Sequence, residues 1–202
     1  MYTIDKIYEE KQEIKKSEFI CTLFPVTSVD EATNFLSLTR KKYYDATHNC
    51  YAYIIGNNAE IIKCSDDGEP SQTAGVVILE ALKKNELTNV LAIVTRYFGG
   101  IKLGAGGLVR AYSSSTSLVI QKINKLKIEK CQELTIVVKY QYFNLIDKYL
   151  KEFKEKEKTF TDDIKITIIV PISKVDELIN KLIEITKNDI EITKGIEESR
   201  VL

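Results

Sequence analysis

The feature that most constrains the fold of this chain is a group of glycines set between two ordinary elements. Five of the nine glycines in the 202 residues lie close together. The residues before them, 89–95, form an apolar run typical of a buried strand, and residues 108–123 have the pattern of a helix. Glycine permits positive φ and close approach to a partner, at an entropic cost relative to alanine. The pattern predicts a strand-to-helix crossing and favours a functional loop there.

The charge around these glycines is one-sided. Residues 87–128 contain no acid and six cations, whereas the whole chain is balanced, with 29 basic and 29 acidic residues. The balance argues against a protein that coats nucleic acid along its length, but the loop lies in a local positive field. A helix N-terminus with free N–H groups would also favour an anion. The predicted anion- or nucleic-acid-binding residues are Arg96, Tyr97, Gly99, Gly100, Lys102, Gly104, Gly106, Gly107 and Arg110.

Known nucleotide motifs do not account for the loop. A Walker A loop requires a lysine and a hydroxyl residue after its second glycine, but Ala105 and Gly106 follow Gly104. A dinucleotide-binding fingerprint requires glycine or alanine where Val109 stands, and an acid about 20 residues further on, which is missing. We therefore expect no cofactor. The alternative is that the glycines only shape a tight crossing, with the nearby cations facing solvent or acidic side chains.

Two aromatic residues, Tyr97 and Phe98, stand beside the first cation of the loop. Rings next to cations could stack on nucleobases while the cations hold phosphates. The alternative is that a ring fills the core beneath the loop. We expect at least one of the two to be buried, because large aromatic side chains dominate core burial.

A second cluster of charge is the acidic turn of residues 65–70, Ser-Asp-Asp-Gly-Glu-Pro. Its three carboxylates, on Asp66, Asp67 and Glu69, could bind Mg²⁺ or act as an acid and a base. Their spacing does not fit an EF-hand loop. Acids just before a helix also favour its positive end without any further role. We expect this structural role and predict no metal site.

His48 is the chain's single histidine and precedes an apolar run. An imidazole titrates near neutrality, so a general base is conceivable. One histidine excludes a metal site built from several, and a hydrogen bond to the backbone is the simpler role. We favour a protein that is not an enzyme. Should it be one, the catalytic candidates are His48, Asp66, Asp67 and Glu69.

Cysteines and hydropathy indicate the compartment. The four cysteines are widely spaced and form no Cys-x-x-Cys pair, which is typical of reduced thiols rather than of zinc ligands or disulfides. The first residues lack the apolar core of a signal peptide. No apolar run approaches the roughly 18 residues that a membrane span needs. We expect a cytoplasmic protein with no membrane partner.

The hydrophobic pattern predicts an α+β domain over residues 1–130. Ser28 followed three residues later by Glu31 indicates a helix N-terminus, and Asn85 follows the last apolar residues of a second helix. A Gly-Asn-Asn sequence at 56–58 indicates a hairpin turn. The expected strands are 4–8, 17–26, 50–55, 61–65 and 89–95, with a charged turn at 11–16, and the expected helices are 28–44, 72–84 and 108–123.

Residues 131–202 have a different hydrophobic pattern, which predicts the order βαββαβ of a ferredoxin-like domain. The boundary, near residues 126–133, carries no linker rich in glycine or proline. A run of lysine and glutamate at 151–158 is expected to be a solvated helix end and turn. The expected strands are 134–139, 158–161, 164–170 and 190–196, and the expected helices are 142–153 and 173–186.

Three motifs in this order resemble a known family. They are residues 48–53 (His-Asn-Cys-Tyr-Ala-Tyr), residues 65–75, which contain the acidic turn and then Thr-Ala-Gly, and residues 95–112, which contain the glycine loop. By these motifs the chain is identified as a bacterial two-domain member of the YigZ/IMPACT family, and the resemblance covers essentially its whole length. Gln72 stands where the family usually has glycine, and Val77 where it usually has proline.

The resemblance implies that residues 1–130 form an IMPACT-type N-terminal domain, with the fold shared by a small-subunit ribosomal protein domain and domain IV of elongation factor G. It implies that residues 131–202 are similar to domain V of that factor. Eukaryotic members of the family regulate translation by competing for an activator of an initiation-factor kinase. For bacterial members, nucleic-acid or ribosome binding is suggested from fold similarity, which by itself does not fix a function.

Three classes of function stay open at this point. The one we favour is a non-enzymatic cytosolic binding protein that docks on RNA or the ribosome through residues 96–110 and takes part in translation regulation. The second is an enzyme that acts on a phosphorylated small molecule with the acidic turn and His48. The third is a regulator that binds only proteins. The oligomeric state is open in all three.

Overall fold

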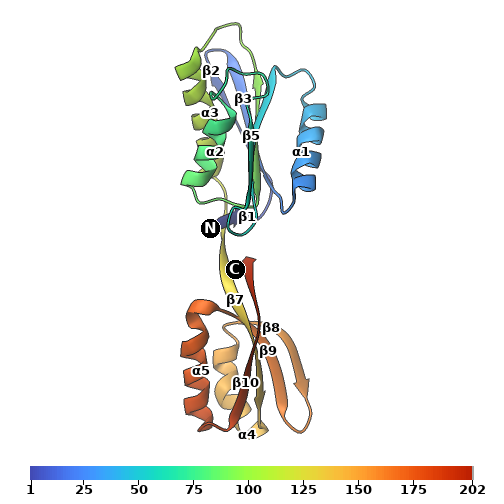
Figure 1. Ribbon diagram of the computed structural model, residues 1–202, viewed down its shortest axis with the longest axis vertical. Helices are drawn as coiled ribbons and strands as arrows, with labels where there is room; N and C mark the ends of the chain where they lie inside the picture. The colour runs from blue at the N-terminus through green and yellow to red at the C-terminus, as the bar shows by residue number, and fades with distance from the viewer. Residues whose placement is uncertain (202) are drawn as a thin grey trace. The chain divides into compact units, whose positions relative to one another are not determined.

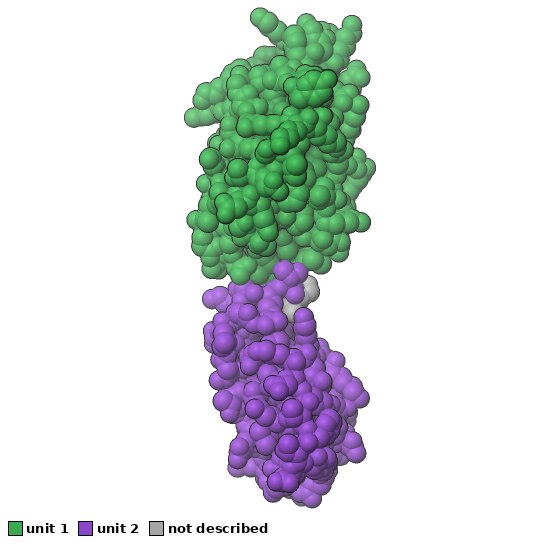
Figure 2. Space-filling model, turned by 90° about the vertical axis from the view of Figure 1, so that its right-hand side faces the viewer, with its two compact units in different colours: residues 1–128 green, residues 129–202 purple. Residues whose placement is uncertain are grey.

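The computed structural model describes residues 1–201 and contains two compact units, residues 1–128 and residues 129 onward (Figure 2). Within the described residues there are five helices and two antiparallel sheets of five strands each (Figure 1). Strand β7 (Lys125–Val138) contributes to both units, because its first residues pair with β1 (Tyr2–Ile4) and its later ones with β9 (Ile164–Pro171). The change of sequence pattern near residues 126–133 therefore falls inside a strand.

Unit 1 is built on one antiparallel sheet with helices on both faces (Figure 1). Helices α2 (Gly75–Lys84) and α3 (Ala105–Ile120) cover one face, and α1 (Val29–Lys42) covers the other. In spatial order the strands are β2 (Tyr8–Ile14), β3 (Ser17–Pro25), β6 (Val90–Tyr97), β4 (His48–Ile55) and β5 (Ile61–Ser65).

Burial along the central strands explains these layers. In β4 the side chains of Cys50, Ala52 and Ile54 join the core beneath α2 and α3, whereas Tyr51 and Tyr53 join the core beneath α1. Successive side chains of a strand point to opposite faces. A nearly continuous apolar strand is therefore what a sheet covered on both faces requires.

The first hairpin differs from the expectation. The turn consists of Lys15 and Lys16, both with positive φ, rather than of residues 11–16. Residues 11–14 pair with β3 instead, and alternate side chains of β2 are half-buried, with Gln12 contacting Ser114 and Ser115 of α3. The first expected strand, 4–8, is wrong as well, because β1 ends at Ile4 and β2 begins at Tyr8.

The helix starts follow from their caps. The predicted N-cap of α1 is confirmed, since Ser28 Oγ accepts the Glu31 N–H at 3.2 Å, although the Glu31 carboxylate accepts the N–H of Thr27 rather than that of Ser28. Helix α2 begins at Gly75, later than expected, because Gln72 has a φ of 64°. Helix α3 begins at Ala105, earlier than expected.

Unit 2 has the order βαββαβ and the strand order β10-β7-β9-β8, with both helices against one face of the sheet (Figure 1). Its core is an apolar cluster that includes Leu134, Ile146 and Leu182. The lysine and glutamate run was expected to be a turn, but it forms most of edge strand β8, where alternating charges protect the open edge. The remaining elements are α4 (Tyr140–Leu150), β8 (Lys154–Phe160), α5 (Ile172–Thr186) and β10 (Ile190–Val201).

Candidate anion-binding site

A hollow of about 290 Å³ lies in unit 1 where β4, the acidic turn, the end of β6 and the start of α3 meet. We call it the loop pocket. Three segments that are far apart in the sequence contribute to it, and each belongs to one of the motifs described above or directly adjoins it. The lining residues are Thr47, His48, Glu69, Pro70, Arg96, Phe98, Lys102, Leu103, Gly104, Ala105 and Leu108.

A buried ion pair forms the floor of this region. Arg96 Nη1 donates to Glu69 Oε1 at 2.6 Å, and the two side chains are only 6% and 3% exposed. The Tyr112 hydroxyl donates to the same carboxylate oxygen at 2.7 Å, and the Cys50 thiol donates to the Tyr112 oxygen at 3.3 Å. Burial raises the pKa of the Cys50 thiol to about 12, and burial together with Cys50 raises that of Tyr112. Both groups therefore stay protonated donors at neutral pH.

Arg96 does not have the exposure expected of a phosphate contact. It lies in strand β6 rather than in the loop, and its guanidinium lies 5.4 Å from the Phe19 ring centre and 5.5 Å from that of Phe98. Its Nε atom is buried and has no hydrogen-bond partner among residues 1–201. The strand places this side chain inward, where it pairs with Glu69 and leaves one donor unused.

His48 forms a hydrogen bond to the backbone, which is the simpler role expected for it from the sequence. Its Nδ1 lies 2.8 Å from the carbonyl oxygen of Asp67. A carbonyl can only accept, so Nδ1 carries a proton, and Nε2 lies 3.9 Å from Glu69 Oε2.

The other two acids of the turn have structural partners. Asp66 Oδ1 accepts the N–H groups of Ala74 and Gly75 at 3.0 and 2.8 Å, and its Oδ2 accepts that of Gln72 at 2.9 Å. It thereby caps α2, which is the structural role expected for the turn. Among residues 1–201 no group of three His, Cys, Asp or Glu side chains could hold a metal ion.

Asp67 is equally engaged. Its Oδ2 accepts the Asn49 N–H at 2.7 Å, and its Oδ1 pairs with Arg40 at 2.5 Å. The acidic turn as a whole lies near the loop, but only Glu69 and His48 of the four catalytic candidates line the loop pocket.

The expectation that Tyr97 or Phe98 is buried is wrong, because neither is. The Tyr97 hydroxyl donates to Asp45 at 2.9 Å, and partial desolvation of the hydroxyl together with this carboxylate raises the pKa of Tyr97 to about 12. Phe98 is 47% exposed and lines the loop pocket, so of the two rings it is the more open to solvent, although the Arg96 guanidinium lies near it. The signal in the sequence was its place after the strand, directly before two glycines.

Lys102 and Arg110 are the exposed cations of the loop. Neither forms an ion pair in the part of the chain that the structure describes. Lys102 lines the loop pocket, whereas Arg110 lines a neighbouring hollow of about 220 Å³ together with Lys15 from the β2–β3 turn. Leu103 borders both hollows. Sequence reasoning placed Lys15 in a charged turn but did not connect that turn with the glycines.

Two of the loop glycines, Gly104 and Gly99, are required for different structural reasons. Gly104 is the N-cap of α3 with a φ of 70°, a conformation that other residues rarely adopt, and it has no side chain to cap the helix. A Cβ on Gly99 would lie 1.9 Å from the Lys16 carbonyl oxygen, so the loop packs directly on the β2–β3 turn. The first N–H groups of α3 therefore have no capping side chain, and Gly104 and Ala105 at this helix start line the loop pocket.

The Impact N-terminal domain model matches residues 15–120, more than half of the chain. The chain belongs to the IMPACT family. This confirms the resemblance, and all three motifs that carried it lie within the matched residues and come together around the loop pocket.

Relatives in the IMPACT family match nearly the whole chain. IMPACT family member YvyE of Bacillus subtilis is 39% identical over 96% of this chain and 90% of its own. IMPACT family member YigZ of Escherichia coli is 31% identical over 93% of both. A solved structure described as a crystal structure of a hypothetical protein is 29% identical, covers 98% of this chain and 97% of its own, and superimposes with a TM-score of 0.63.

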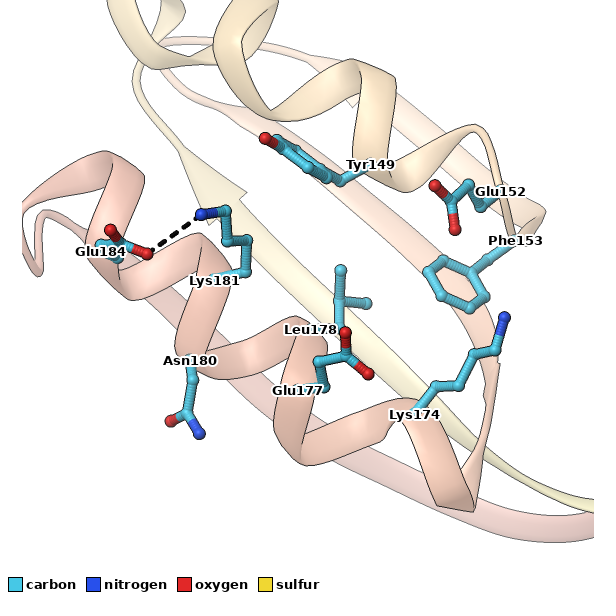
Figure 3. A pocket seen from close by; sticks show the side chains of 9 residues that line it. All are labelled: Tyr149, Glu152, Phe153, Lys174, Glu177, Leu178, Asn180, Lys181 and Glu184. Carbon is cyan, nitrogen blue, oxygen red and sulfur yellow. Dashed lines mark hydrogen bonds and ion pairs between the residues drawn. The ribbon is translucent and has the colours of Figure 1, made fainter.

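Unit 2 contains a larger hollow of about 610 Å³ between the end of α4 and α5 (Figure 3). Its rim carries acidic and basic side chains, and its two lysines already have contacts: Lys181 pairs with Glu184 at 3.1 Å, and Lys174 lies 5.8 Å from the centre of the Phe153 ring. None of the three IMPACT motifs contributes to it. The loop pocket is therefore the better candidate site.

Proposed function

We propose that this IMPACT-family chain is a non-enzymatic protein that regulates translation by docking on RNA, free or within the ribosome, through the surface of residues 98–110. The observation that carries the proposal is the pair of exposed cations, Lys102 and Arg110, which lack ion pairs within residues 1–201 and flank the uncapped start of α3. Family membership supports a regulatory role.

The charges of this surface suit the phosphate backbone of RNA. Lys15 and Lys16 at the adjoining turn are exposed as well, and Gly99 packs against that turn, so four cations surround the start of α3. Phosphate contacts position a protein on nucleic acid and supply most of its non-specific affinity. The overall neutrality of the chain then confines RNA to this surface.

Phe98 supplies a stacking platform beside these cations. Its ring is half-exposed at the rim of the loop pocket. Aromatic side chains bind unpaired bases by stacking, whereas cations hold the backbone. The preferred RNA is therefore single-stranded.

The geometry supports an enzyme less well. Asp66 and Asp67 are occupied by the backbone of the α2 start and by Asn49 and Arg40. Glu69 already accepts from Arg96 and Tyr112. General acid–base catalysis needs a group within hydrogen-bond reach of substrate and free to exchange a proton.

The proposal also includes a location in the cytoplasm. The four free cysteines suit the cytoplasm. Within residues 1–201, no helix is long and apolar enough to cross a membrane. The likeness to a ribosomal protein domain and to domains IV and V of elongation factor G, which the family resemblance implies, would fit a partner on the ribosome.

The test is fluorescence anisotropy with a labelled single-stranded RNA over a series of salt concentrations. We expect binding at low salt and a fall in log affinity against log salt of about 0.7 per phosphate contacted. The double variant Lys102→Glu, Arg110→Glu should lose about tenfold or more in affinity, because two phosphate contacts become repulsive.

The matched control is Lys63→Glu, Lys84→Glu, which makes the same charge change at two exposed lysines away from the loop. Equal losses in the two double variants, or no binding at low salt, would overturn the proposal. Capture of a protein partner after nuclease treatment, with no RNA binding, would favour the protein-binding regulator instead.

A further inference from the structure

Strand β5 is the last strand at one edge of the unit 1 sheet (Figure 1). It pairs with β4 on one side, and no strand among residues 1–201 pairs with its other side. Alternate N–H and C=O groups of an edge strand point away from the sheet and stay available to another chain. The start of α2 packs against the last residue of β5, because a Cβ on Gly75 would lie 2.6 Å from the Ser65 backbone. The accessible part of the edge is therefore residues 61–64.

Two isoleucines flank the backbone of this edge, one on each face of the sheet. The register with β4 places Ile61 beside Ile55, on the face that α1 covers. It places Ile62 beside Ile54, on the face of α2 and α3. The two edge isoleucines are 45% and 44% exposed. A segment that was added to the sheet as a further strand would bury both of them.

The opposite edge of the same sheet is protected, which shows that the open edge is not a general property of unit 1. In edge strand β2, Glu10 pairs with Lys122 at 2.8 Å and Lys11 pairs with Glu18 at 2.6 Å. The Gln12 amide donates to two hydroxyls of α3. Charged side chains and covering elements are the usual means that keep an edge from pairing with another chain. No side chain of β5 forms an ion pair in the described part of the chain.

Lys63, in the middle of β5, indicates the charge of the missing strand. Its side chain is exposed, and the nearest acids in the sequence are engaged elsewhere: Glu60 accepts from Asn58 at 3.0 Å, and Asp66 caps α2. An acid opposite Lys63 would complete a cross-strand pair. A second copy of this chain fits less well, because the register that pairs all five residues of two β5 strands places one Lys63 opposite the other.

We propose that β5 docks a short extended segment of a partner protein as an additional antiparallel strand. The segment carries an acidic residue opposite Lys63 and β-branched apolar residues on both sides of it. Backbone hydrogen bonds supply affinity in this mode of recognition, and the side chains supply specificity. The inference goes beyond the proposed RNA binding and does not depend on it. No residue of β5 lines the loop pocket, so RNA and the protein segment would not compete.

The probe is the peptide acetyl-Thr-Val-Glu-Val-Ile-Thr-amide, which in antiparallel pairing places its glutamate opposite Lys63. Titrated into the isotope-labelled full chain, it should shift the nuclear magnetic resonance signals of the amides of residues 61–64 and slow their hydrogen exchange. Alternate N–H groups of an added strand point toward its neighbour. Of two peptides that are N-methylated at alternate residues, one should therefore lose about tenfold in affinity and the other should keep it.

Charge reversal tests the side-chain part of the proposal. Lys63→Glu should weaken binding about fivefold, and a peptide with lysine in place of glutamate should bind this variant more tightly than the unmodified chain. The matched control is Lys154→Glu, at an exposed lysine of edge strand β8, which should keep the affinity. The double variant Ile61→Thr, Ile62→Thr should lose binding without a fall in melting temperature, since both side chains are already half-exposed.

Three results would overturn the docking of a partner segment on β5. They are unchanged amide signals of residues 61–64 in a large excess of peptide, equal affinity of the two N-methylated peptides, and association of two copies of the chain that Lys63→Glu abolishes in analytical ultracentrifugation. The RNA titrations described above are independent of all three, so failure of this proposal leaves the RNA-binding function standing.

Discussion

The two units of the chain differ in how deeply they bury paired charged side chains. In unit 2 the described charged side chains lie at the surface, and several pair with a neighbour three or four residues away, as Lys181 does with Glu184. In unit 1 Glu69 and Arg96 pair across 27 residues and are almost fully buried. Burial of charges costs solvation that their attraction only partly returns. Unit 1 therefore contains a buried ion pair with a large solvation cost, and this pair lies where the three IMPACT motifs meet.

This difference indicates that the features that carry stability and function are distributed unevenly between the two units. The core of unit 2 is an ordinary apolar cluster, whereas the core of unit 1 continues into a polar network of Glu69, Arg96, Tyr112 and Cys50. Networks of this kind hold a unique geometry only while every member has its partner. Substitutions should therefore have unequal consequences in the two units.

The largest effect should come from Glu69→Ala. The substitution leaves the buried Arg96 without its counter-ion and Tyr112 without its acceptor, so unit 1 should lose about 3–5 kcal/mol of unfolding free energy. Urea unfolding followed by circular dichroism measures the loss. The double variant Glu69→Leu, Arg96→Met removes both charges and should recover most of it. A loss below about 1 kcal/mol would mean that the pair behaves like a surface pair.

A smaller effect is expected at the start of α2. Asp66→Ala removes the acceptor of the Ala74 and Gly75 N–H groups and should cost about 1–2 kcal/mol, the usual loss for a helix cap. The same unfolding experiment applies, with Asp66→Asn as the control, because its amide oxygen can still accept. Equal losses for the alanine and asparagine variants would show that the contact with these N–H groups is not what stabilises the turn.

The smallest effect should occur in unit 2. The partners of the Lys181–Glu184 pair are 43% and 73% exposed, so Lys181→Ala should change the unfolding free energy by no more than about 0.5 kcal/mol. Differential scanning calorimetry at low and high salt would measure it. A loss comparable with that of the Asp66→Ala variant would remove the contrast between the units.

Much of the fold could be predicted because its signals are local. The N-cap at Ser28 and the hairpin at 56–58 depend on residues a few positions apart, and the structure has both. Only the end of β8 falls in the strand expected at 158–161. Its start, residues 154–157, could not be predicted, since lysine and glutamate favour a strand there only through pairing with β9.

The candidate site was predictable only in outline. The glycines and Lys102 stand out in the sequence. The inward direction of the Arg96 side chain depends on Glu69, however, and which of the two rings is exposed depends on the contact of Tyr97 with Asp45. These partners lie 27 and 52 residues away. No local pattern reports such contacts, because only the folded sheet brings the segments together.

Gln72 shows how the backbone after the acidic turn is held in its conformation. The residue has a left-handed backbone at a position where the family resemblance leads us to expect glycine, and its N–H group is held by the Asp66 carboxylate. The Asp66 carboxylate thus holds this backbone conformation, so a residue other than glycine can occupy position 72.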